Sequence, residues 1–137
     1  MRKSDVVYCG IFFKNTPFEG KLCIPVAYPH VTHMYRPWPK DIHPEFFGKE
    51  VRATAFGYGN DSKNEGVLVS LRCDDQALSE ALKSIVVPHI TISVNRDGRP
   101  VDTGKLTFEQ MPEMVTIVGR YGAFCNDNHV YYSLEEE

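Results

Sequence analysis

The chain has 137 residues, of which 42% are hydrophobic and 24% charged, and its formal net charge is −3. These values are typical of one globular domain with enough apolar residues for a core, and they exclude a disordered chain. Proteins that coat long nucleic acids usually carry a basic surface, so the negative charge argues against that class. It leaves open a compact pocket for one or two nucleotides.

The cysteines and the apolar runs indicate the compartment. Four cysteines are scattered without a C-x-x-C pair, which favours buried free thiols over a disulfide framework (Cys9, Cys23, Cys73, Cys125). No apolar run is long enough to span a bilayer, and the N-terminus has no signal-peptide core. We therefore expect a cytoplasmic protein without a membrane partner.

The first half of the chain predicts strands. Residues 6–14 are rich in β-branched and aromatic side chains, and residues 22–35 form a second extended stretch. Residues 40–47 read as a loop or a short helical turn. Residues 49–58 alternate between apolar and polar, and a turn over residues 59–66 leads to a returning strand at 67–72.

The second half contains the one convincing helix. Asp74 is a good N-cap, and residues 75–85 place apolar side chains at helical spacing. A strand at 88–94 follows, then a turn at 95–100 and a last pair of strands at 115–119 and 130–134 around a loop at 122–128. The order predicts a single α+β domain over residues 1–137, two-lobed and dominated by an antiparallel β-sheet with few helices.

A short motif occurs twice, and each copy lies in a predicted strand. The copies are Pro29-His30-Val31-Thr32 and Pro88-His89-Ile90-Thr91. Residues two apart in a strand point to the same face, so each histidine projects together with its threonine. Two such strands side by side would bring two imidazoles and two hydroxyls into one groove. The duplication therefore predicts a phosphate site.

This set of residues suits phosphodiester hydrolysis. Imidazole titrates near neutral pH, so one histidine can deprotonate a water molecule while the other protonates the leaving oxygen. The threonine hydroxyls, with Ser93 extending the line on the second strand, can donate hydrogen bonds to phosphate oxygens. Such a mechanism needs no metal or cofactor.

The paired H-Φ-T-Φ motifs, where Φ is apolar, resemble those of the 2H phosphoesterase superfamily. That group includes 2′,3′-cyclic nucleotide phosphodiesterases, LigT-like RNA phosphoesterases and the cyclic phosphodiesterase modules of tRNA ligases. The segment 98–104 also resembles the Pro-Val stretch that follows the second motif in the cyclic nucleotide branch. The chain departs from the pattern at His33, where an apolar residue is expected, and at residues 15–21, where a loop replaces a helix.

The resemblance implies roles for individual residues. His30 and His89 would be the acid/base pair, with the assignment between them open, and Thr32 and Thr91 would hold the phosphate. A nucleotide also needs an apolar face to rest on, for which Tyr35, Trp38 and Phe12 are candidates, and Arg36 could add charge near the phosphate.

The same residues also permit other interpretations. His30, His33 and His43 could be metal ligands, but a spacing of three in a strand points the first two to opposite faces. Cys125 has no adjacent base in the sequence, so a cysteine nucleophile is a weak hypothesis. A single His-x-Thr is common in strands, and the two copies could be a coincidence within a β-rich interaction domain.

We therefore expect a metal-independent phosphodiesterase that acts on 2′,3′-cyclic phosphates of nucleotides or RNA ends, or on small cyclic or 2′–5′ oligonucleotides. The expected partner is a nucleotide or RNA-end substrate rather than a long duplex. The alternative is a non-catalytic nucleotide- or RNA-binding module that keeps the same pocket.

Overall fold

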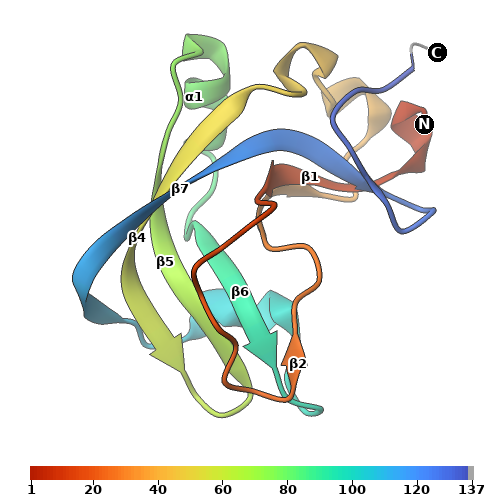
Figure 1. Cartoon of the computed structure of the whole chain (residues 1–137). Coiled ribbons are helices and arrows are strands. Elements are labelled where there is room, and N and C mark those ends of the chain that lie inside the picture. The colour runs from red at the N-terminus through yellow and green to blue at the C-terminus, as the bar shows by residue number, and fades with distance from the viewer. Residues whose placement is uncertain (136–137) are drawn as a thin grey trace.

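A computed structural model describes residues 1–135 as one continuous antiparallel sheet with a single α-helix (Figure 1). The strands pair in the order β2-β6-β5-β4-β7-β1-β3, and β8 pairs with β7. This confirms an α+β, strand-dominated fold. The elements are β1 (Val6–Phe12), β2 (Ile24–Pro25), β3 (His30–Tyr35), β4 (Glu50–Asn60), β5 (Asn64–Arg72), α1 (Gln76–Leu82), β6 (His89–Val94), β7 (Glu109–Cys125), β8 (Val130–Tyr131), and 3₁₀ turns at Lys3–Asp5, Pro39–Asp41, Pro44–Phe46 and Pro100–Lys105.

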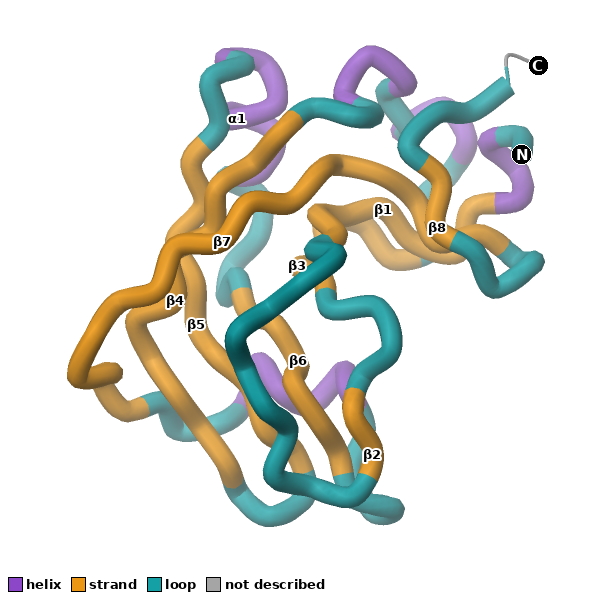
Figure 2. Tube along the Cα trace, in the orientation of Figure 1, coloured by secondary structure: helices purple, strands orange, loops and turns teal. Residues whose placement is uncertain are grey.

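The sheet curls around its core. Strand β3 ends the pairing order, yet it approaches β6, near the other end, to within 8 Å between Cα atoms (Figure 2). The two motif strands therefore lie side by side without a hydrogen-bonded ladder between them. The enclosed face carries the buried apolar side chains, to which α1 adds Leu78 and Leu82. Burial of this apolar surface is the main stabilising contribution to the fold.

Strand β4 follows the alternation seen in the sequence. Val51, Ala53 and Ala55 are fully buried, while the residues between them lie at the other face. Strand β7 is much longer than the predicted strand at 115–119, because it continues through Gly122 to Cys125 and pairs with β4 along one part and with β1 along another. The predicted loop at 122–128 is therefore wrong in its first half.

Two local predictions are corrected by hydrogen bonds. The hairpin turn is shorter than predicted, since Asn64 and Glu65 already belong to β5. The helix N-cap is Asp75 rather than Asp74, because the Asp75 carboxylate accepts a 2.8 Å hydrogen bond from the Leu78 amide. Asp74 instead forms an ion pair with Arg52 at the surface.

The cysteines of the described residues are free thiols. Cys9 and Cys125 are buried as expected, Cys73 is half-buried, and Cys23 is exposed. Between residues 1 and 135, no helix has the length and apolar character needed to cross a membrane.

Candidate functional site

His30 and His89 are held by the same local structure. Each opens its strand directly after a proline, and each Nδ1 lies 2.7 Å from the carbonyl oxygen two residues earlier, on Tyr28 and Val87 respectively. A carbonyl oxygen only accepts, so Nδ1 carries the proton in both rings. The Nε2 atoms of both histidines are thereby left for another partner, as acid/base chemistry requires.

The strands that pair with the two motif strands also have the same arrangement. Strand β1 pairs with β3, and β5 pairs with β6, so that Gly10 lies opposite Thr32 and Gly66 lies opposite Thr91. In both pairs the register shifts immediately before the glycine. Each half of the site is therefore built from its own strand pair with a bulge. This structural repeat is larger than the four-residue motif seen in the sequence.

Both glycines are required by a close approach of the neighbouring backbone. A Cβ atom on Gly10 would lie 2.1 Å from the Val31 carbonyl oxygen, and one on Gly66 would lie 2.7 Å from that of Ile90. In each case three apolar residues follow the glycine, at 11–13 and at 67–69. This duplicated glycine-plus-three-apolar pattern is the sequence signal that sequence reasoning overlooked.

The surroundings of His30 shift its pKa. Burial is the largest effect on His30 and lowers its pKa, the hydrogen bond to the Tyr28 carbonyl raises it, and the charge of His89 lowers it again. The net result places the pKa of His30 below its ordinary value of 6.5. His30 is therefore neutral at neutral pH, with a free lone pair on Nε2.

An aromatic wall surrounds His30. The Tyr8 ring stacks on the imidazole with 4.6 Å between centroids, and the Phe12 ring lies 5.6 Å away. The Tyr8 hydroxyl is 3.5 Å from Nδ1. Burial, together with the charge of Tyr28, raises the pKa of Tyr8 to about 12, so it remains a neutral phenol. Tyr8 was not predicted as a site residue because it reads as an ordinary strand aromatic.

The two motif threonines differ in their surroundings. Thr32 is exposed. Thr91 is 7% exposed, and its hydroxyl donates within the 3₁₀ turn that covers β6, with Oγ1 2.8 Å from Thr103 Oγ1 and 3.3 Å from the Pro100 carbonyl oxygen. A hydroxyl has one proton to donate. The Thr32 hydroxyl is therefore available to a phosphate, whereas the Thr91 hydroxyl holds the 3₁₀ turn in place over β6.

Ser93 has a structural position, which removes it from the predicted substrate-binding set. It is fully buried, and its hydroxyl donates a 2.6 Å hydrogen bond to the Glu65 carboxylate. Glu65 also accepts from the Tyr58 hydroxyl and from the Lys21 amide. The Ser93 oxygen in turn accepts from the amide of Leu22. This network anchors the loop between β1 and β2, which crosses the front of the molecule in Figure 1.

Three of the predicted substrate-binding residues lie at the other end of β3. His30 begins this strand and Tyr35 ends it, so at about 3.3 Å per residue they are roughly 16 Å apart. Tyr35 and Trp38 are 65% and 73% exposed, and Arg36 lies over the Tyr35 ring at 5.5 Å. The structure does not bring these residues to His30. Phe12 is the one predicted stacking residue that it places there.

His33 occupies the extra position created by the register shift in β3. The equivalent position in β6 is Ile92, which explains why a residue outside the motif pattern fits here. Its Nδ1 is 2.6 Å from the Tyr121 hydroxyl and its Nε2 is 3.1 Å from the Ala81 carbonyl oxygen. Both ring nitrogens are thus satisfied inside the protein, and His33 ties β3 to β7 and α1.

The possible metal ligands are not brought together. His33 faces the core side with Tyr121, and His43 pairs with Glu45 at the surface. Among the histidines, cysteines and acidic residues between positions 1 and 135, no group of three is arranged to hold a metal ion.

Comparisons with protein-family models, curated proteins and solved structures find no match for this chain.

Proposed function

We propose that this protein is a phosphodiesterase of the 2H type, which hydrolyses 2′,3′-cyclic phosphates or small oligonucleotides with His30 as general base and His89 as general acid. The observation that carries the proposal is the duplicated histidine. Two imidazoles on adjacent strands each have Nδ1 bound to a backbone carbonyl and Nε2 available. A single histidine in a strand would have a structural explanation, whereas a duplicated local geometry indicates a shared purpose.

The lowered pKa of His30 supports the assignment of His30 as base and His89 as acid. His30 has a pKa below its ordinary value, because burial beside Tyr8 and Phe12 disfavours its charged form. A neutral imidazole is the form that accepts a proton, so His30 is the base. His89 then takes the complementary part as the acid.

The reaction balances with these two groups. His30 Nε2 removes a proton from water as the water oxygen forms a bond to phosphorus. The bond from phosphorus to the leaving oxygen breaks, and His89 in its protonated form donates its Nε2 proton to that oxygen. The exposed Thr32 hydroxyl can donate to a non-bridging oxygen as its negative charge develops. Proton exchange with solvent then restores both histidines.

The test is turnover of 2′,3′-cyclic nucleotides and cyclic-phosphate-ended RNA in EDTA, by wild type, His30→Ala and His89→Ala. General acid–base catalysis contributes about 10²- to 10⁴-fold, so each variant should lose at least about 100-fold in kcat. His43→Ala is the matched control, because this histidine is exposed and pairs with Glu45 at the surface. Activity that is lost in EDTA, or that survives in either variant, contradicts the proposal.

One observation favours the alternative of a nucleotide-binding module without turnover. The Thr91 hydroxyl is committed to Thr103 and Pro100, so the second half of the site offers one phosphate donor fewer than the motif implies. Under this alternative, wild type binds the same nucleotides, and no phosphate bond is cleaved in any buffer.

A further inference from the structure

Two adjoining hollows lie beside the aromatic wall of His30. The first has a volume of about 270 Å³ and lies between the end of β1, the residues before β3 and the segment around β8, with Tyr28 and Pro29 in its lining. The second has a volume of about 250 Å³ and includes Arg120 of β7. Phe12, Lys14 and Tyr132 line both, so the hollows form one groove with a shared middle (called the Lys14 groove below).

The register of the sheet gives the direction of this groove. His30 lies opposite Phe12 in the β3–β1 pair, and Phe12 lies opposite Arg120 in the β1–β7 pair. Directly paired residues project from the same face, and neighbouring strands are about 4.8 Å apart. The Cα atom of Arg120 is therefore about 10 Å from that of His30. His30, Phe12 and Arg120 form a row that runs away from His89.

The Lys14 groove combines positive charge with aromatic surface. Lys14 and Arg120 are both exposed, and within residues 1–135 neither has a carboxylate within ion-pair distance. Glu50 faces Arg120 across the β4–β7 ladder and does not come within 4.0 Å. Tyr28 is 41% exposed and Tyr132 is half-buried, so each can offer a ring face.

Cations interleaved with aromatic rings are the pattern by which proteins hold single-stranded nucleic acid, since bases stack on the rings and phosphates meet the cations. Each hollow lies below the range of about 300–1,000 Å³ typical of sites for drug-sized ligands, and each has room for one base. Two ring-sized hollows with Lys14 between them match two consecutive bases and the phosphate that joins them.

We propose that the Lys14 groove binds two consecutive nucleotides of a single-stranded oligonucleotide, on one side of the phosphodiester held at His30. The position of that reacting phosphodiester rests on the proposed function. The groove makes an oligonucleotide the preferred substrate over a mononucleotide, because a mononucleotide leaves at least one hollow and one cation unused.

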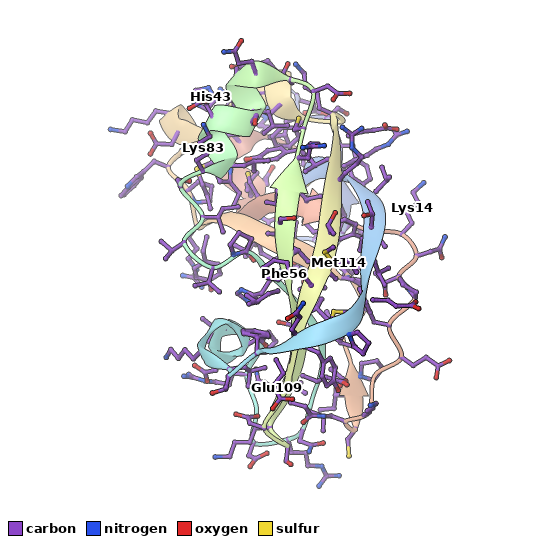
Figure 3. The ribbon with its side chains drawn as sticks, turned by 90° about the vertical axis from the view of Figure 1, so that its left-hand side faces the viewer. Lys14, His43, Phe56, Lys83, Glu109 and Met114 are labelled. Carbon is purple, nitrogen blue, oxygen red and sulfur yellow. The ribbon has the colours of Figure 1, made fainter. Side chains whose placement is uncertain are left out.

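The turnover test compares a trinucleotide that ends in a 2′,3′-cyclic phosphate with a 2′,3′-cyclic mononucleotide. Wild type should show a kcat/KM ratio of at least about 10 in favour of the trinucleotide. Lys14→Ala and Arg120→Ala should each lower this ratio about 5- to 10-fold. Lys83→Ala is the matched control, because this lysine lies at the end of α1, away from Lys14 (Figure 3), and should leave the ratio unchanged. A ratio near 1 in wild type, or the same ratio in all variants, overturns the proposal.

A binding test is independent of catalysis. The His30→Ala/His89→Ala background is titrated with a fluorescein-labelled tetranucleotide RNA at several salt concentrations, with and without Lys14→Ala/Arg120→Ala. Each phosphate contact contributes about 0.7 to the slope of log K against log salt for single strands, so the loss of two cations should reduce the slope by about 1.4. An unchanged slope overturns the Lys14 groove. A reduced slope in a protein whose wild type cleaves none of the substrates supports the groove and rejects the proposed catalytic function.

Discussion

Alanine at Gly10 tests whether the close approach of β1 and β3 is what builds the first half of the site. The added Cβ would lie 2.1 Å from the Val31 carbonyl oxygen, whereas close carbon–oxygen contacts between strands begin near 3.3 Å. The shortfall of about 1.2 Å must be met by moving backbone, since both atoms are fixed by the ladder. Overpacking costs about 1–3 kcal/mol, and each lengthened hydrogen bond adds about 0.5–1.5 kcal/mol. We expect Gly10→Ala to lower the free energy of unfolding by about 3 kcal/mol.

The assay is urea denaturation followed by circular dichroism. Gly57→Ala is the matched control, because it also lies in a strand but its nearest contacts are side-chain carbons at 3.3 Å, which need to give by only a few tenths of an ångström. It should cost less than about 1 kcal/mol, and Gly66→Ala should resemble Gly10→Ala. If Gly10→Ala is no more destabilising than Gly57→Ala, the paired-glycine account of the site is refuted.

Three further predictions concern single groups. Asp75→Ala removes the N-cap of α1 and an ion pair with Lys49, so it should cost about 1 kcal/mol in urea denaturation, whereas Asp74→Ala should cost less than about 0.5 kcal/mol; equal costs would contradict the cap assignment. Tyr8→Ala exposes His30 to water and should raise its pKa toward 6.5, which moves the acidic limb of the pH–rate profile to higher pH; an NMR titration of His30 that does not change would refute the burial argument. The hydrogen bonds from Ser93, Tyr58 and the Lys21 amide outweigh the effect of burial and lower the pKa of Glu65, so its stabilising contribution is present above its ordinary value of 4.5 and is lost as pH falls below it. Wild type should therefore lose more stability than Glu65→Gln between pH 5 and pH 3, and parallel losses would count against this network.

The prediction of strands and of the helix succeeded where a local pattern decides the structure. The alternation around Val51, Ala53 and Ala55 is a property of the strand itself, and the sheet buries the face that the sequence indicated. Strand β7 was largely missed because its first half carries exposed polar residues and its second half contains Gly119 and Gly122. Its length is set by pairing with β4 and β1, which no local pattern encodes.

The candidate site was predicted in part for a similar reason. The motif is local to each strand, and the curl of the sheet brings β3 close to β6, so that the charge of His89 acts on His30. Whether a hydroxyl is free depends on tertiary contacts. Thr91 has the same spacing from its histidine as Thr32, and Ser93 follows two residues later in the same strand. The 3₁₀ turn nevertheless covers Thr91, and Glu65 holds Ser93.

The two halves of the site share one architecture and differ in what covers them. On the β6 side, Thr91 is buried beneath Thr103, and a Cβ on Gly104 would lie 3.0 Å from the His89 ring, so this half is closed and fixed. On the β3 side, Thr32 is exposed and the Lys14 groove begins at the aromatic wall. The sequence predicted that Tyr35, Arg36 and Trp38, which follow the first motif, contact the substrate. The structure places these residues at the far end of β3, about 16 Å from His30, and only the Pro29 end of the strand adjoins this histidine. Variation in substrate preference is therefore expected to arise from the residues that line the Lys14 groove.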